Sequence, residues 1–272
     1  MPIVTTRDGA GLYVKDWGDG PTVVLIHGWP LNADMWEYQA VALFEAGFRV
    51  ISYDRRGFGR SDQPAAGYDY NILADDLADI IEASGADHVS LVGFSMGGGE
   101  VARYLGRHGP ARVNRATLIS AVTPYMLKTQ DNPDGVDETV LEGIEEGLRQ
   151  DRAKFLGDFG KNFYGIGWVS QPVSQQWLDW TQSMALMASP IATLACVDAF
   201  GRTDFRADMA AFTMPTLIVH GTSDKTVPID PTARAAARLV SGAQLIEYGG
   251  EPHGLFATVP DQLNGDLIRF LS

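Results

Sequence analysis

The stretch LVGFSMGGG, residues 91 to 99, decides the fold of this chain. An apolar run, Val89 to Gly93, passes directly into the pentapeptide GFSMG, residues 93 to 97, and a helical pattern, Met96 to His108, begins at once. This order is that of a nucleophile elbow, G-x-S-x-G, in which a serine sits on a strained turn between a strand and a helix. Small residues must flank the serine because the strand and the helix nearly touch there. The stretch therefore predicts a reactive hydroxyl at the carboxyl end of a strand.

Outward from this stretch, short apolar segments alternate with helical patterns. Such alternation predicts an α/β fold, in which a mostly parallel sheet is covered by helices on both faces. The further predicted strands are Leu12 to Trp17, Val23 to His27, Arg49 to Tyr53, Ala116 to Ser120, Thr216 to His220 and Gln244 to Tyr248. The further predicted helices are Met35 to Ala46, Tyr70 to Ala83, Thr232 to Val240 and Asp261 to Leu271.

One long segment interrupts the alternation. Residues 124 to 209 carry helical periodicity and many aromatic side chains but no convincing strand. An all-helical segment inserted between strands is typical of a cap over the carboxyl edge of the sheet, where open α/β sheets bind their ligands. We therefore expect one core domain, residues 1 to 123 and 210 to 272, with a helical cap formed by residues 124 to 209.

A serine hydroxyl needs a general base, and the base needs an orienting acid. After a nucleophile elbow, the acid and the histidine follow the serine in that order along the chain. Asp224 lies in a loop after one predicted strand, and His253 lies in a loop after the next. His220 is predicted to end a strand, which favours a buried structural role. We therefore predict that Ser95, Asp224 and His253 are the catalytic residues.

Acyl transfer also needs hydrogen-bond donors for the oxyanion of the tetrahedral intermediate. One donor is predicted to be the N–H of Met96, because it follows the nucleophile. The other is predicted in the loop His27-Gly28-Trp29-Pro30, where the N–H of Trp29 is the natural candidate. Pro30 lacks an N–H of its own, but it restricts the backbone of Trp29 and so fixes the neighbouring donor.

Several other side chains receive weaker interpretations. Phe94, Phe163 and Phe256, together with Pro30, are candidates for a small apolar acyl pocket, although the aromatic side chains could equally form the core of the cap. The helical pair Asp75-Asp76 is interpreted as a solvated helix face rather than an acid/base pair.

Composition limits the partners and the location. Lys and Arg total 21 against 34 Asp and Glu, a net charge of −13, so nucleic acids and anionic membranes are poor partners. The chain shows no signal-peptide pattern and no apolar run near the roughly 18 residues of a transmembrane helix, so we expect a cytoplasmic protein. Cys196 is the single cysteine, and no metal-ligand spacing or phosphate-binding loop occurs, so we expect no metal and no cofactor.

Several segments together resemble the bacterial arylesterases and cofactor-free haloperoxidases, also called perhydrolases, of the α/β-hydrolase superfamily. They are HGWP (27–30), YDRRGFGRSDQP (53–64), VGFSMGGGEVARY (92–104), TDFRADM (203–209), HGTSDKTVP (220–228) and GGEPHGL (249–255). The resemblance implies an α/β-hydrolase fold with a mostly parallel, eight-stranded sheet, the triad and the oxyanion donors given above, and no cofactor. It also implies small ester or carboxylic acid substrates and a trimer or hexamer.

The sequence thus favours a serine carboxylesterase that acts through an acyl-enzyme and, with peroxide, as a perhydrolase or cofactor-free haloperoxidase. Two alternatives stay open: a lactonase or γ-lactamase with the same triad, and a non-catalytic binding protein of hydrolase fold. A substrate panel separates the first alternative, and labelling by a serine-directed reagent separates the second. A dehalogenase would need a carboxylate at the elbow, where this chain has Ser95.

Overall fold

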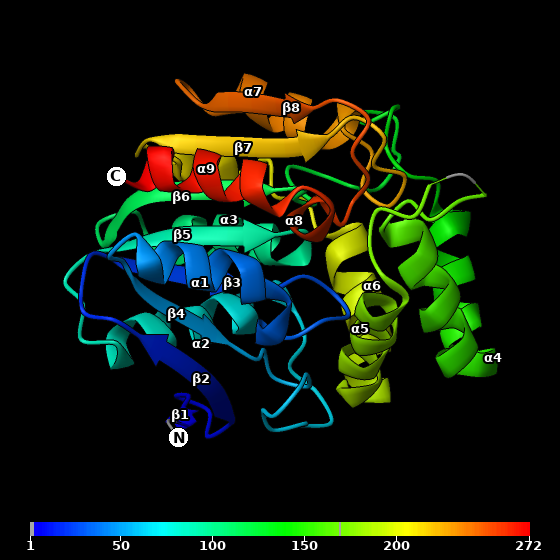
Figure 1. The fold of residues 1–272 in the computed structure, drawn as a ribbon, viewed down its shortest axis with the longest axis horizontal. Coiled ribbons are helices and arrows are strands. Elements are labelled where there is room, and N and C mark those ends of the chain that lie inside the picture. The colour runs from blue at the N-terminus through cyan, green and yellow to red at the C-terminus, as the bar shows by residue number, and fades with distance from the viewer. Residues whose placement is uncertain (1–2, 169) are drawn as a thin grey trace.

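A single eight-stranded sheet forms the centre of the computed structural model, which describes residues 3 to 168 and 170 to 272. Its strands are β1 Ile3–Thr5, β2 Gly11–Trp17, β3 Thr22–Ile26, β4 Arg49–Tyr53, β5 Val89–Phe94, β6 Val113–Ile119, β7 Thr216–Gly221 and β8 Gln244–Tyr248. Their order across the sheet is β1-β2-β4-β3-β5-β6-β7-β8 (Figure 1). The pairs β1–β2 and β2–β4 are antiparallel and the other pairs are parallel, which confirms the expected mostly parallel sheet of eight strands.

Helices cover both faces of the sheet. The flanking helices are α1 Glu37–Glu45, α2 Tyr70–Ala83, α3 Met96–His108 and α9 Pro260–Leu271. Successive side chains of a strand point to opposite faces. In β3, Val24 and Ile26 therefore join the apolar cluster under α2 and α3, while Val23 and Leu25 join the cluster under α1 and α9. The sheet thus separates two apolar cores, and its central strands are buried on both sides.

Helices α2 and α3 have the predicted bounds, but other elements differ from the prediction. Strand β1 was not predicted, because three residues at a sheet edge carry little pattern. The predicted helix from Met35 begins instead with a 3-10 turn, Ala33–Trp36, which the Asn32 side chain caps by accepting from the N–H of Asp34. The helix predicted from Thr232 is a π-turn, Asp230–Arg234, followed by α7, Ala235–Leu239. The short helix α8, Leu255–Thr258, was also not predicted.

Three helices lie beyond the carboxyl ends of the parallel strands, to the right of the arrowheads of β5 and β7 in Figure 1. They are α4 Glu138–Phe163, which has non-helical backbone angles at Asp151, α5 Gln175–Met187 and α6 Pro190–Arg202. This confirms a helical insert, whereas the boundaries of the cap at residues 124 and 209 stay a prediction. By length and apolar character, no single helix in the described part of the chain could cross a membrane; α5 and α6 would pass only as a pair, bent by 96°.

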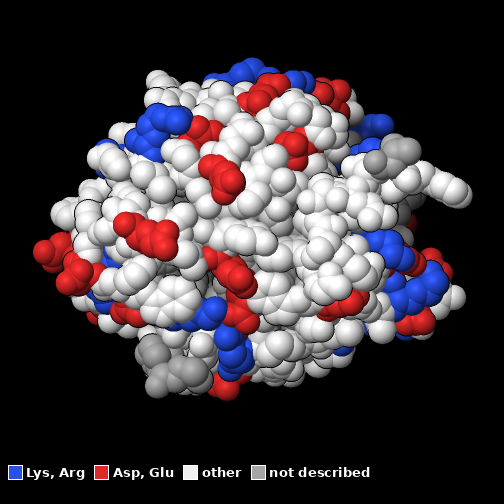
Figure 2. Space-filling view, in the orientation of Figure 1, with Lys and Arg blue, Asp and Glu red and all other residues white. Residues whose placement is uncertain are grey.

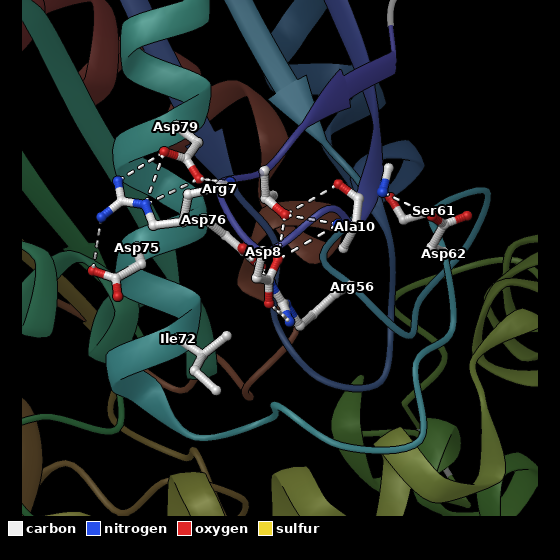
Figure 3. A network of polar contacts seen from close by, with 12 residues as sticks. Arg7, Asp8, Ala10, Arg56, Ser61, Asp62, Ile72, Asp75, Asp76 and Asp79 are labelled. Atoms are coloured by element: carbon white, nitrogen blue, oxygen red, sulfur yellow. Dashed lines mark hydrogen bonds and ion pairs between the residues drawn. The ribbon is translucent and has the colours of Figure 1, made fainter.

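The pair Asp75-Asp76 is not simply a solvated helix face. Asp76 is buried, and both of its carboxylate oxygens accept from the guanidinium of Arg56, at 2.6 and 2.5 Å. The same guanidinium donates to Asp8 in the turn between β1 and β2 (Figure 3). Asp75 lies nearer the surface and pairs with Arg107. The interpretation was wrong for Asp76, because its buried partner comes from the loop after β4 rather than from its own helix.

Charges are scattered over the face seen in Figure 2. Lys and Arg side chains there are separated by acidic and uncharged surface and form no continuous basic patch on that face. The expectation that nucleic acids are not partners stays a prediction.

Candidate active site

The nucleophile elbow is present at the junction of β5 and α3. Ser95 has a φ of 54° and a ψ of −119°, a conformation that non-glycine residues rarely adopt. A Cβ at Gly93 would lie 2.5 Å from the carbonyl oxygen of Gly97, and one at Gly97 would lie 2.4 Å from the carbonyl oxygen of Ile26. The two flanking glycines are therefore required by close backbone approach, as the sequence pattern predicted.

The three predicted catalytic side chains form one hydrogen-bonded row. Ser95 Oγ lies 2.9 Å from His253 Nε2, and His253 Nδ1 lies 2.6 Å from Asp224 Oδ2. Asp224 lies in the loop after β7 and His253 precedes α8, so loops at the carboxyl edge supply all three residues. A non-catalytic binding protein has no need of this row.

Hydrogen-bond roles fix the protonation pattern of the row. Because a carboxylate only accepts, Nδ1 of His253 carries the proton and Nε2 is free to accept from the Ser95 hydroxyl. The other oxygen of Asp224, Oδ1, accepts the backbone N–H groups of Thr226 and Val227 at 2.9 and 2.8 Å. Burial alone would raise the pKa of Asp224, but the adjacent His253 and His220 outweigh it and lower that pKa below its usual range. Asp224 is thus ionised at neutral pH.

His220 contributes a further contact to the catalytic acid. The side chain is buried, as predicted, and its Nε2 lies 2.8 Å from the carbonyl oxygen of Val227 and 3.2 Å from Asp224 Oδ2. Both neighbours are acceptors, so Nε2 carries the proton, which it donates to Val227, while Asp224 lies in polar contact with the same nitrogen. Nδ1 has no hydrogen-bond partner among the described residues. The sequence interpretation missed this role; its signal is a histidine four residues before the acid, at the end of the strand that leads into the acid's loop.

We expect His220→Leu to lower kcat by about tenfold, because Asp224 loses the N–H group that lies 3.2 Å from its Oδ2 and helps to hold the carboxylate in place. His220→Gln keeps an N–H donor near the position of Nε2 and should restore most of kcat. Steady-state kinetics of the two variants measure this. Equal impairment of both variants would reduce His220 to a packing role.

The predicted oxyanion donors lie next to the nucleophile. A Cβ at Gly28 would lie 3.0 Å from Ser95 Cβ, so the loop after β3 touches the elbow. Trp29 follows in that loop, lines the same cavity as Ser95 and forms a cis peptide bond with Pro30. Met96 begins α3, where the first N–H groups have no partner within the helix. These positions suit an oxyanion hole, and the assignment stays a prediction.

The buried ion pair of Arg55 and Glu100 packs against this loop after β3 and stabilises it. Arg55 Nε donates to Glu100 Oε2 at 2.6 Å, and Arg55 Nη2 donates to the carbonyl oxygen of His27 at 2.7 Å. The backbone N–H of Arg55 donates to His27 Nε2 at 2.9 Å, so Nδ1 of His27 carries the proton and donates to the carbonyl of Gly28. Burial, with Arg55 nearby, holds the pKa of His27 well below its ordinary value. The sequence interpretation missed this support because its members are distant along the chain.

A small apolar cavity opens beside Ser95, with a volume of about 30 Å³. Its walls come from the core loops and from cap helices α4 and α6. The lining residues are Trp29, Ser95, Val122, Met126, Val136, Val140, Leu141, Ile144, Phe159, Phe200, Thr226 and Val227. The walls are thus almost wholly apolar, and a substrate group that fits them is small and apolar.

These lining residues include none of the four side chains predicted for an acyl pocket. The rings of Phe94 and Phe163 lie 4.9 and 4.8 Å from the His253 ring, and Phe256 packs against Phe94 at 5.0 Å. All three are buried, as is Pro30. The rings of Phe94 and Phe163 therefore flank the His253 imidazole and restrict its rotation, and Phe256 packs against both of these rings.

The described residues contain no group of three or more His, Cys, Asp or Glu side chains that could hold a metal ion. The expectation of a metal-free and cofactor-free site stays a prediction.

Comparison with known proteins agrees with this site. The family model described as "alpha/beta hydrolase fold" matches residues 21–258. A non-heme chloroperoxidase, CPO-A1 of Kitasatospora aureofaciens, is 45% identical over 100% of both chains. A bifunctional esterase/perhydrolase of Acinetobacter calcoaceticus is 40% identical over 100% of this chain and 99% of its own. The crystal structure of a bromoperoxidase from Bacillus anthracis has a TM-score of 0.95 and 43% identity, covering 99% of this chain and 98% of its own.

Proposed function

This chain belongs to the alpha/beta hydrolase family and, within it, to the non-heme chloroperoxidase and esterase–perhydrolase group; on this premise we propose that it hydrolyses small esters through an acyl-enzyme on Ser95. It is a serine hydrolase. The observation that carries the proposal is the continuous row of hydrogen bonds from Asp224 through His253 to Ser95, which ends beside an apolar cavity.

The proposed reaction follows from the roles of these groups. Ser95 Oγ attacks the ester carbonyl while His253 Nε2 takes its proton, and Asp224 stabilises the imidazolium that forms. The N–H groups of Trp29 and Met96 stabilise the oxyanion. His253 then returns the proton to the leaving alcohol, which departs and leaves the acyl-enzyme. A water molecule activated by His253 releases the acid and restores Ser95.

Hydrogen peroxide is the second proposed acceptor of the acyl group. When peroxide replaces water in the last step, the product is a peracid, and a released peracid oxidises halide without a metal ion. The Acinetobacter relative, named as an esterase and a perhydrolase, supports this second reaction. The expected trimer or hexamer and the cytoplasmic location remain predictions.

A panel of substrates tests the proposal. We expect kcat/KM to be highest for p-nitrophenyl esters of short acyl chains, because the cavity is small and apolar, and lower for lactones and a γ-lactam. Adding a carboxylic acid with hydrogen peroxide should yield peracid. Faster turnover of a lactone or γ-lactam than of every ester would favour that alternative instead.

Leu141 is expected to limit the length of the acyl group. It lines the cavity from α4, and its side chain packs against Gly201 of α6. Leu141→Ala should raise the ratio of kcat/KM for hexanoate over acetate about tenfold, since the vacated volume adjoins the cavity. A loss of stability of about 2–5 kcal/mol accompanies such a truncation and is measured by denaturant unfolding.

Leu148→Ala is the matched control, because Leu148 is buried in the same helix but is not among the residues lining the cavity. It should lose similar stability and leave the acyl preference unchanged. The same change of preference in both variants would refute the role of Leu141.

A further inference from the structure

We propose that Met126 is a site of oxidation by the peracid that this enzyme forms, an inference that rests on the proposed perhydrolase activity. Met126 and Ser95 line the same cavity of about 30 Å³. Only 2% of the Met126 residue is exposed, so an oxidant formed within the cavity reaches its thioether more readily than an oxidant in the surrounding solvent.

The backbone holds Met126 at this cavity. The N–H of Val122 donates to the carbonyl oxygen of Ser95 at 3.3 Å, so the segment after β6 lies against the nucleophile. Further along, the N–H of Val136 donates to the carbonyl oxygen of Met126 at 2.7 Å. Val122, Met126 and Val136 all line the cavity. Met126 therefore belongs to an ordered wall and faces the place where the acyl group is transferred to peroxide.

The chemistry needs no oxidant beyond the proposed product. A peracid transfers its terminal oxygen to the thioether sulfur: the O–O bond breaks, an S–O bond forms, and the proton moves to the carboxylic acid that leaves. The sulfur loses two electrons and the peracid gains them. Met126 is the only sulfur-containing residue among the described residues that line the cavity. Its thioether is also the most readily oxidised group there.

The product would change the cavity. A sulfoxide is polar, and the surrounding walls are apolar apart from Ser95 and Thr226, so its oxygen adds a polar atom to a cavity that otherwise receives an apolar group. We therefore expect both activities to fall as peracid is turned over.

The test compares Met126 with Met187, which is 45% exposed and lies outside the cavity. Wild type is incubated with acetate and hydrogen peroxide, with excess free methionine to consume released peracid. Sulfoxide at each methionine is then measured by peptide mass spectrometry, and peracid by dye oxidation without the scavenger. We expect Met126 to be oxidised about tenfold faster than Met187, because the scavenger protects only the exposed side chain.

Two variants serve as controls. Ser95→Ala forms no peracid, so its Met126 should stay unmodified at the same peroxide concentration. Met126→Leu, measured against its own starting activity, should keep its esterase activity through a treatment in which wild type loses most of it.

Each contrary outcome is distinct. Peracid formation by wild type without preferential oxidation of Met126, or equal oxidation of Met126 in Ser95→Ala, overturns this inference alone. Absence of peracid from wild type overturns the proposed perhydrolase activity and this inference with it, whereas ester hydrolysis is measured separately.

Discussion

Replacing Ser95 with alanine is expected to lower kcat for p-nitrophenyl acetate on the order of 10⁶-fold, because the acyl-enzyme cannot form without its oxygen. The fold should remain, since the change removes one atom from a turn that is already formed by the backbone. Active-site titration of the purified variant tests the loss of activity, and thermal unfolding tests whether the fold remains.

Ser120→Ala is the matched control for this variant. Ser120 is also buried at the end of a parallel strand with a positive φ, of 44°, and its hydroxyl has no partner among the described residues. It should keep near wild-type activity. If Ser95→Ala retained a comparable kcat, the assignment of the nucleophile would be wrong.

The second large effect is expected at the acid of the row. Asp224→Asn should lower kcat about 10⁴-fold, because an amide cannot hold His253 in the tautomer that accepts from Ser95. His253→Ala should cost at least about 10³-fold, since no base remains.

Asp230→Asn is the control for charge, because Asp230 lies in the segment that follows the same strand but is exposed and pairs only with Arg234 among the described residues. It should change kcat less than about twofold, as surface ion pairs contribute little. An Asp224→Asn enzyme with wild-type turnover would remove Asp224 from the mechanism.

The elements around the nucleophile could be predicted from local sequence. Helix α2 begins after Asp69, whose side chain accepts from the N–H groups of Asn71 and Ile72. Such a cap can be predicted from the sequence, because Asp is a favoured residue at this position. The elbow is equally local, because the contacts that require Gly93 and Gly97 arise within one strand–turn–helix unit and its neighbouring strand. Loops after parallel strands meet at one edge, so Asp224 and His253 could be placed near the serine without a structure.

What could not be predicted depends on contacts between distant segments. Phe163 lies in the cap, and whether it faces the cavity or the imidazole is decided by how α4 packs on the core. Arg55 and Glu100 look like surface charges in the sequence, yet the fold buries them together beside the loop after β3. His220 could be predicted as buried, but its contact with Asp224 depends on the path of the loop after β7.

Labelling with a fluorophosphonate tests the central claim most directly, since such a reagent phosphonylates only a serine that a neighbouring base activates. Intact-mass and peptide analysis should find one adduct per chain, on the peptide that contains Ser95, with activity lost in proportion. Ser95→Ala should take no label, and His253→Ala should take it much more slowly. An adduct on another residue, or full activity after complete labelling, would contradict the account.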